Sequence, residues 1–161
     1  MLITDYTTYD DVRAVLGVST DELEDTTLAL ETYASALLLD LEDVDVALPA
    51  AYSALPGTGR TAAEERFFVT VRLFATYAVA RQLTSSLPMF GPKDITDGKA
   101  GVTRFADSPY KETIKRLQAE YDRYRTRLEK AYAGLTAGAY TLTVPTFLSV
   151  ASPTSDPVTG T

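Results

Sequence analysis

The C-terminal segment 134–161 constrains the fold of this chain most, because it contains a single charged residue, Asp156. Tyr140, Leu142 and Val144 alternate with threonines, and this period of two is typical of a β-strand. A lone strand leaves backbone N–H and C=O groups unpaired, and such groups pair readily with another chain. We therefore expect an extended arm that docks on a neighbouring polypeptide, and an assembly protein rather than a self-contained enzyme.

The composition excludes several classes of active site. The chain contains no His and no Cys, which rules out disulfides, zinc-thiolate sites, Ser-His-Asp hydrolysis and His-ligated metal centres. We therefore expect neither an enzyme nor a cofactor. No apolar run approaches the roughly 20 residues of a membrane helix, and the acidic N-terminus lacks the basic and apolar regions of a secretory signal. We expect no membrane association.

The net charge of −7 is unevenly spread along the chain. Residues 1–48 carry 12 acids and one base, Arg13, whereas residues 49–106 carry 7 bases and 4 acids and residues 107–133 carry 7 bases and 5 acids. Such segregation suits side-by-side packing of copies, because unlike faces attract. It would also follow if the acids served solubility or helix N-terminal electrostatics. The acidic surface argues against sequence-specific binding of nucleic acid.

Capping signals and apolar periodicity predict one short helix and three long ones. Thr8 caps a short helix over 9–16 that Gly17 ends, and Ser19 with Glu22 forms a capping box for a helix over 19–44. Thr61 begins a central helix that ends near residue 83, and the last helix covers 108–133 and ends at Gly134.

Two of these helices carry clear apolar stripes. In the second helix the predicted core stripe is Leu23, Thr27, Leu30, Ala34, Leu37, Leu41 and Val44. In the last helix it is Tyr110, Ile114, Leu117, Tyr121, Tyr124, Leu128 and Tyr132. The tyrosines indicate either a helix edge half covered by the core or a contact surface for another subunit.

The predicted fold is all-α. It is an antiparallel bundle of three long helices plus a short N-terminal helix, with an extended loop or hairpin over 88–107 and an extended C-terminal arm. A short turn of helix is expected near residues 50–53. Residues 1–135 form the bundle domain and residues 136–161 form the docking arm.

Three stretches resemble the head-to-tail adaptor, or connector, proteins of tailed bacteriophages. They are TTYDDVRAVLGVSTDELEDTTL near the N-terminus, DITDGKAGVTRFADSPYKETIKRLQAEY before and within the last helix, and VPTFLSVASPTSDPVTGT at the C-terminus. The resemblance covers nearly the whole chain. It implies a helical structural protein of the virion neck, made in the host cytoplasm, that forms a ring of typically twelve sister subunits beneath the portal.

The resemblance also implies partners for particular segments. The arm would reach the portal protein or neighbouring copies, tail or stopper proteins would bind the other face, and DNA would pass through the central channel without sequence-specific binding. The acidic segment 20–45 is expected to line that channel. The implied contact residues are Tyr140, Leu142, Val144, Phe147, Leu148 and Val150 in the arm, and Lys99, Arg104 and Phe105 in the loop.

Two other functions remain open at the level of sequence. One is a different phage neck or tail-completion protein, which would use the same arm on another partner. The other is a small helical regulator whose acidic face mimics DNA and occupies a basic protein.

Overall fold

A computed structural model describes residues 2–84, 94–96, 101–103 and 111–137. The described part is predominantly α-helical, as predicted, with one short 3₁₀ turn and one two-stranded hairpin. The elements are η1 (Ile3–Asp5), α1 (Tyr9–Leu16), α2 (Asp25–Leu28), α3 (Glu31–Glu42), α4 (Leu48–Ser53), α5 (Ala62–Leu83), β1 (Asp94–Thr96), β2 (Gly101–Thr103) and α6 (Lys111–Ala137).

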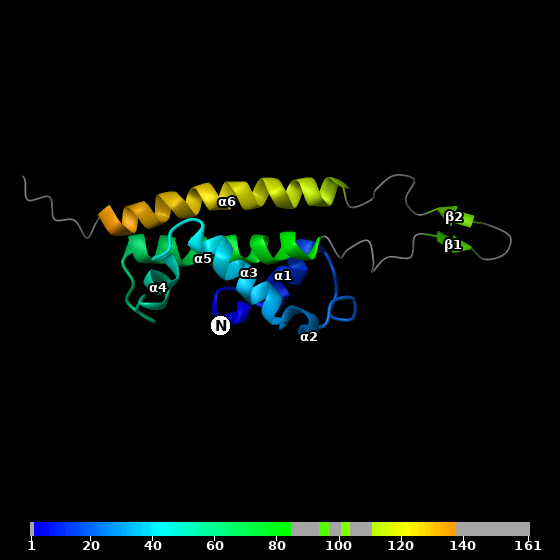
Figure 1. Cartoon of the computed structure of the whole chain (residues 1–161), viewed down its shortest axis with the longest axis horizontal. Coiled ribbons are helices and arrows are strands. Elements are labelled where there is room, and N and C mark those ends of the chain that lie inside the picture. Colours follow the sequence, from blue (N-terminus) through cyan, green and yellow to red (C-terminus); the bar gives the residue numbers. More distant parts are fainter. Residues whose placement is uncertain (1, 85–93, 97–100, 104–110, 138–161) are drawn as a thin grey trace, which may run out of the picture.

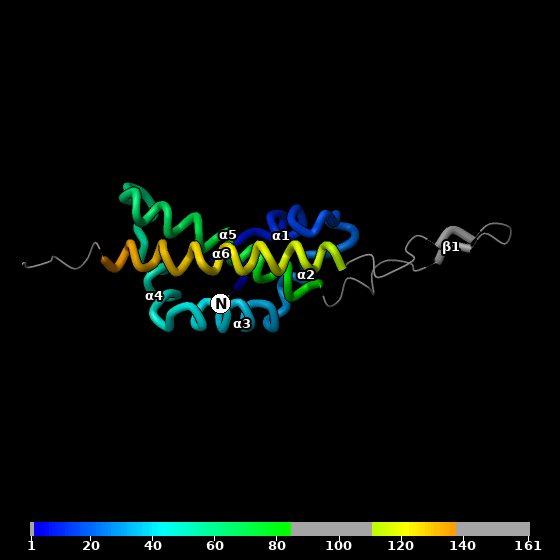
Figure 2. The backbone as a smooth tube through the Cα atoms, turned by 90° about the horizontal axis from the view of Figure 1, so that it is seen from above, coloured from blue at the N-terminus to red at the C-terminus, as the bar shows by residue number. Residues whose placement is uncertain are grey.

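Helix α5 is the centre of the helical block. Helix α6 runs antiparallel along one face of α5, and α1, α3 and α4 contact its other faces (Figure 1). Seen from the side of α6, α1 and α3 lie on opposite flanks of the α5–α6 pair (Figure 2). The block therefore has an α6 layer, a buried α5, and a layer of N-terminal helices with two distinct flanks.

The core is built around α5, which buries side chains in several directions. Phe67, Val71 and Phe74 are fully buried, and so are Ala75, Ala78 and Val79 on an adjoining face. Their partners are Val12 of α1, Leu37 and Leu41 of α3, Leu48 of α4, and Leu117 and Leu128 of α6, all with no exposed surface. Each of these Val, Leu and Phe side chains contributes about 1.5–3 kcal/mol by leaving water, and the predicted central position of this helix is confirmed.

Local signals position the ends of α1 and α5. The Thr8 hydroxyl accepts a hydrogen bond from the Asp11 amide at 3.1 Å, and Gly17 ends α1 with φ of 74°, a left-handed conformation that glycine adopts without strain. At α5, Thr61 and Glu64 form the reciprocal capping box that their spacing predicts. Both helices begin where the sequence indicates because caps depend only on neighbouring residues.

The predicted continuous helix over 19–44 is wrong. The Ser19 amide donates to the Glu22 carboxylate at 2.8 Å, which is one half of the predicted capping box. The Ser19 hydroxyl donates to the same carboxylate instead of accepting from the Glu22 amide, and a helix does not follow. The Leu23 carbonyl accepts a hydrogen bond from Arg13 Nε at 2.8 Å, while the Thr27 amide bonds to Glu24 instead. A tertiary contact thus uses the carbonyl that helix propagation requires, and the chain forms only the short α2 before α3.

The break changes which residues face the core. Leu30 precedes α3 with ψ of 133°, an extended conformation, and its side chain is 53% exposed. Leu28, which the predicted stripe omits, is fully buried in its place. From Ala34 onward the stripe is confirmed, because Ala34, Leu37 and Leu41 are all buried. The described part of the chain therefore has two long helices and a shorter α3, where the sequence predicts three long ones.

Helix α6 differs from its prediction at its C-terminal end and at Ile114 of the predicted apolar stripe. Leu117, Tyr121 and Leu128 are buried, but Ile114 is 40% exposed and Tyr110 lies outside the described residues. Gly134 does not end the helix, which continues to Ala137. A glycine costs a helix only about 1 kcal/mol relative to alanine, and Leu135 packs against the core one residue later. The first two residues of the predicted arm, 136–137, are therefore helical.

The segment between α5 and α6 contains a hairpin, one of the two alternatives that the sequence left open. Strands β1 and β2 are antiparallel, with Asp94 opposite Thr103, Ile95 opposite Val102 and Thr96 opposite Gly101. Residues 97–100, between the two strands, lie outside the described residues. Figure 1 shows the strands beyond the end of the block where α5 ends and α6 begins.

Replacing Phe74 tests the role of α5 as the centre of the core. The Phe74 ring is fully buried and lies 5.2 Å from the ring of Tyr121. Phe74→Ala is expected to lower the free energy of unfolding by about 3–5 kcal/mol, because it leaves a cavity. Urea denaturation followed by circular dichroism measures this. The control is Leu39→Ala, which alters a side chain 63% exposed and should change stability by no more than about 0.5 kcal/mol. Equal losses would contradict the assignment.

The capping box of α5 predicts a pH dependence. The Thr61 amide and hydroxyl donate to the Glu64 carboxylate at 2.7 and 2.9 Å, and these bonds lower the pKa of Glu64 from its ordinary 4.5. Because the folded pKa lies below the unfolded one, this contribution to stability is present above the unfolded value and is lost as the pH falls through the folded value.

We therefore expect Glu64→Gln to be less stable than the unaltered chain at neutral pH, and this difference to shrink on acidification to about pH 3. Thermal unfolding at both pH values measures it. Glu31→Gln is the matched control, since it alters a carboxylate in the first turn of α3 that takes no part in a capping box. The interpretation fails if both substitutions show the same change with pH.

Candidate subunit-contact surface

All nine contact residues predicted from the sequence lie outside the described residues, so the structure neither places them nor brings them together. This applies to Tyr140, Leu142, Val144, Phe147, Leu148 and Val150 of the arm and to Lys99, Arg104 and Phe105 of the loop. The described helical block nevertheless carries three features with functional potential: two polar junctions and one apolar groove.

The first polar junction joins α3, α5 and α6 at Asp40. Its carboxylate accepts hydrogen bonds from Arg81 Nη2 at 3.2 and 3.3 Å, from Gln82 Nε2 at 3.2 Å and from the Tyr121 hydroxyl at 3.1 Å. The Arg81 guanidinium also lies 3.9 Å from the centre of the Tyr121 ring, a cation–π geometry. The side chain of Asp40 is only 14% exposed.

The chemistry of this junction favours structure over catalysis. Burial, and then the negative charge of Asp40, raises the pKa of Tyr121, so the hydroxyl stays protonated and donates to the carboxylate. Both oxygens of Asp40 are occupied by donors. A carboxylate held in this way fixes the angle of three helices but has no free lone pair directed at a substrate.

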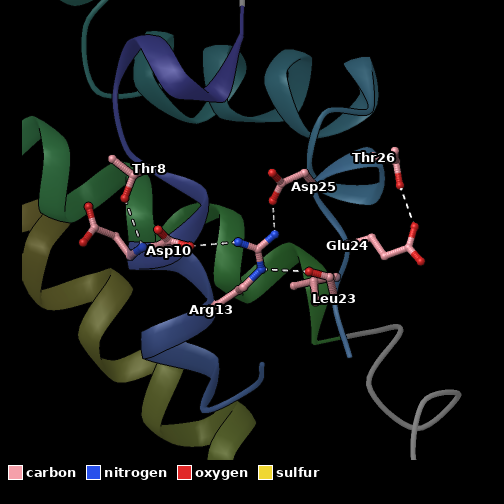
Figure 3. Close-up of polar contacts among 8 residues, drawn as sticks. Thr8, Asp10, Arg13, Leu23, Glu24, Asp25 and Thr26 are labelled. Atoms are coloured by element: carbon pink, nitrogen blue, oxygen red, sulfur yellow. Dashed lines mark hydrogen bonds and ion pairs between the residues drawn. The ribbon is translucent and has the colours of Figure 1, made fainter. Parts of the chain in front are cut away.

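The second polar junction surrounds the buried guanidinium of Arg13 on α1 (Figure 3). It donates to Asp10 at 2.9 Å, to the Leu23 carbonyl at 2.8 Å and to Asp25. The hydrogen bond to Asp25 is the main cause that raises the pKa of Arg13. This cation anchors the turn before α2 to α1, and it is the only basic residue in 1–59.

The third feature is an apolar groove on the α1 flank, formed by α1, α5 and α6. Val69 and Leu73 of α5 form its exposed floor, with 44% and 38% of their surface accessible. Three adjoining hollows share residues and so form one continuous surface. We call it the α5 groove, and its apolar lining consists of Ala14, Val15, Phe68, Val69, Leu73, Tyr77 and Tyr124.

Tyr77 and Tyr124 connect the α5 groove to α6. Their rings stack 5.0 Å apart, and burial, followed by the interaction with Tyr124, raises the pKa of Tyr77. The Tyr77 hydroxyl therefore stays protonated at physiological pH, and the stacked pair presents apolar ring surface beside polar hydroxyls. Such tyrosine pairs are common where one protein surface packs on another.

Arginines outnumber acids at the rim of the α5 groove. Arg66, Arg72, Arg116, Arg123 and Arg127 line it, against Asp11, Glu65 and Glu120. Arg72 pairs with Asp11 and Arg123 pairs with Glu120. Arg66 and Arg127 form no ion pair with any residue that the structure describes. The groove thus combines an apolar floor with unpaired positive charge.

The α3 flank has the opposite character. Residues 14–59 contain nine acids and no Lys or Arg. We call the C-terminal end of α3 and the turn that follows it the α3 ridge, defined by Leu39, Glu42, Asp43 and Val46. Leu39 is 63% and Val46 81% exposed, and the Glu42 and Asp43 carboxylates have no hydrogen-bond or ion-pair partner among the described residues.

Sequence reasoning missed the α5 groove because α5 is apolar on several sides. Its periodicity identifies a buried helix but does not show which strip the other helices leave uncovered. Val69 and Leu73 are therefore indistinguishable in sequence from Val71 and Phe74. Tyr124 of the predicted tyrosine stripe lines the groove, and the use of this stripe as a contact surface stays a prediction.

Comparison with protein-family models, with curated proteins and with solved structures finds no match to this chain. Among the described residues there is also no cluster of metal-ligating side chains. No helix in that part of the chain has the length and apolarity required to span a membrane.

The junction at Asp40 can be tested by a double-mutant cycle with Tyr121→Phe. Asp40→Ala is expected to cost about 1–3 kcal/mol, because it leaves buried donors unpaired. The coupling energy with Tyr121→Phe should be about 0.5–1.5 kcal/mol, which corresponds to one hydrogen bond. Urea denaturation of the four proteins measures it. A second cycle that combines Asp122→Ala with Tyr121→Phe is the control, and its effects should be additive. Additive effects in the Asp40 cycle as well would contradict the hydrogen bond between Asp40 and Tyr121.

Proposed function

We propose that this protein is a head-to-tail adaptor of a tailed bacteriophage, which forms a ring between the portal and the tail and lets DNA pass through its channel. The observation that carries the proposal is the placement of opposite charge on opposite flanks of one helical block. The segment that contains α3, residues 14–59, has nine acids and no Lys or Arg, whereas arginines without an ion-pair partner among the described residues line the α5 groove on the α1 flank.

The physical argument is one of symmetry. Two different surfaces on opposite flanks can meet only head to tail, and a repeated head-to-tail contact closes into a ring when the rotation between copies permits it. Opposite charges favour this contact and disfavour the meeting of like flanks. A ring of typically twelve copies, as the sequence resemblance implies, is the closed form of such packing.

The proposed arm supplies the contact with the portal. Residues 138–161 carry one charge and a β-type alternation, which suits addition of a strand to an exposed sheet edge. Ordering such a segment costs about 1–2 kcal/mol per residue in backbone entropy. Multiplication of one contact around a ring offsets this cost through avidity.

The proposal also assigns a role to the acids that precede α2. Asp21, Glu22 and Glu24 are exposed, and they do not take part in the Arg13 junction that holds Asp25. A channel lined by such carboxylates repels the phosphates of DNA and prevents it from adhering. We therefore restrict the expected channel lining to these residues.

Deletion of the arm tests the proposed function. Removal of 138–161, which starts after the last described residue of α6, should leave the thermal unfolding of the helical block unchanged and abolish binding to the portal protein of the same virus. Native mass spectrometry of mixtures with the portal measures the complex. Removal of 136–161, the boundary predicted from sequence, would shorten α6 and confuse the two effects.

Substitutions within the arm provide the matched control. Tyr140, Leu142 and Val144 changed together to Ser alter one side of the predicted strand, and Thr141 and Thr143 changed to Ser alter the other. The apolar set should weaken portal binding and the threonine set should not. Portal binding that persists after complete deletion of 138–161 would refute the proposal for the arm.

A further inference from the structure

We propose that the α3 ridge of one copy docks into the α5 groove of the next copy, so that the groove is the site that joins neighbours head to tail. The proposal specifies the contact within the ring proposed above and rests on that function for its biological setting. The contact itself is argued from the surfaces of the helical block.

The first step is that the two surfaces match in chemistry. The floor of the α5 groove exposes Val69 and Leu73, and the α3 ridge presents Leu39 and Val46. Contiguous apolar surface rimmed by charge is typical of protein contact sites. Packing of the ridge on the groove would remove both apolar surfaces from water, which is the main driving force of association.

The second step is that the charges left unpaired within the molecule are complementary. Arg66 and Arg127 at the groove have no ion-pair partner among the described residues, and Glu42 and Asp43 at the ridge have none either. Arginine and carboxylate form strong, directional pairs when they meet. Contact between copies would satisfy both sets and fix the register of the docked ridge.

The third step is that the geometry requires a second copy. The ridge lies on the α3 flank and the groove lies on the α1 flank, with the α5–α6 pair between them (Figure 2). One molecule therefore cannot fill its own groove. Because the two surfaces differ, the contact is head to tail and does not produce a closed two-fold dimer.

Charge favours the ridge over the arm as the occupant of the groove. Residues 138–161 contain Asp156 alone as a charged residue, so an arm would leave the unpaired arginines of the rim without partners. The apolar floor and the acids Asp11, Glu65 and Glu120 at the same rim are equally unsuited to the phosphate backbone of DNA.

Cysteine cross-linking tests this contact directly, because the chain contains no native Cys. The full-length double variant Leu39→Cys with Leu73→Cys is treated with a bismaleimide, alone and together with the purified portal protein. We expect a ladder of covalent oligomers on a denaturing gel. Each single variant should remain monomeric, since a head-to-tail contact brings position 39 against 73 and never against itself.

Matched controls separate specific docking from random collision. Leu39→Cys with Lys130→Cys places the second thiol on an exposed part of α6 outside the groove and should give no ladder. In the Leu39→Cys with Leu73→Cys variant, Arg66→Glu with Arg127→Glu reverses the charge at the rim of the groove and should reduce the yield of cross-linked oligomers at least tenfold. Addition of Glu42→Lys with Asp43→Lys reverses the charge of the ridge as well and should restore the yield. Lys111→Glu with Lys130→Glu makes the same change in net charge away from the groove and should have no effect.

Three results would overturn the proposal. The first is that the double variant gives no ladder, either alone or with the portal protein. The second is a ladder from the single variant Leu39→Cys, which would indicate a two-fold contact. The third is that Glu42→Lys with Asp43→Lys fails to restore cross-linking to the variant with the reversed rim, although its circular dichroism is unchanged. The two hypotheses also separate. A portal-bound ring without the ladder would refute this contact but keep the adaptor function, whereas a ladder without portal binding would keep the contact and refute that function.

Discussion

The burial of α5 is the constraint on which the rest of the structure depends. A helix that is apolar on several sides must be covered from several directions, and α1, α3, α4 and α6 each cover one part of it. Four helices do not close completely around a fifth. The uncovered strip at Val69 and Leu73 is what remains, so the groove is a direct result of how α5 is enclosed.

Polar contacts then decide where the covering helices lie. Asp40 connects α3 to Arg81 of α5 and Tyr121 of α6, which fixes the side of α3 that faces inward. Leu39, the residue before Asp40, is displaced by about 100° around the helix, and its side chain is 63% exposed. The ridge is thus determined by the same junction that stabilises the block.

The parts of the fold that sequence predicted well are those set by neighbouring residues. Thr8, Gly17 and the Thr61–Glu64 box position helix ends through contacts within one turn. The continuous helix over 19–44 was wrong because Arg13, distant in sequence, removes the Leu23 carbonyl from the helical pattern. For the candidate site, the sequence indicated the charge segregation and Tyr124. It did not indicate Val69 or Leu73, because their exposure depends on which strip of α5 the surrounding helices leave uncovered.

The amino-acid sequence by itself determined that this chain is helical, that one helix is central, that its acids and bases are separated, and that it lacks the side chains of thiol and histidine chemistry. These properties follow from composition and from spacing along a single chain. Only the tertiary structure decided that α3 lies on the flank opposite α1, and that the groove with its unpaired arginines forms on the α1 flank. The physical reason is that a flank exists only once α3 and α1 have packed on different sides of α5.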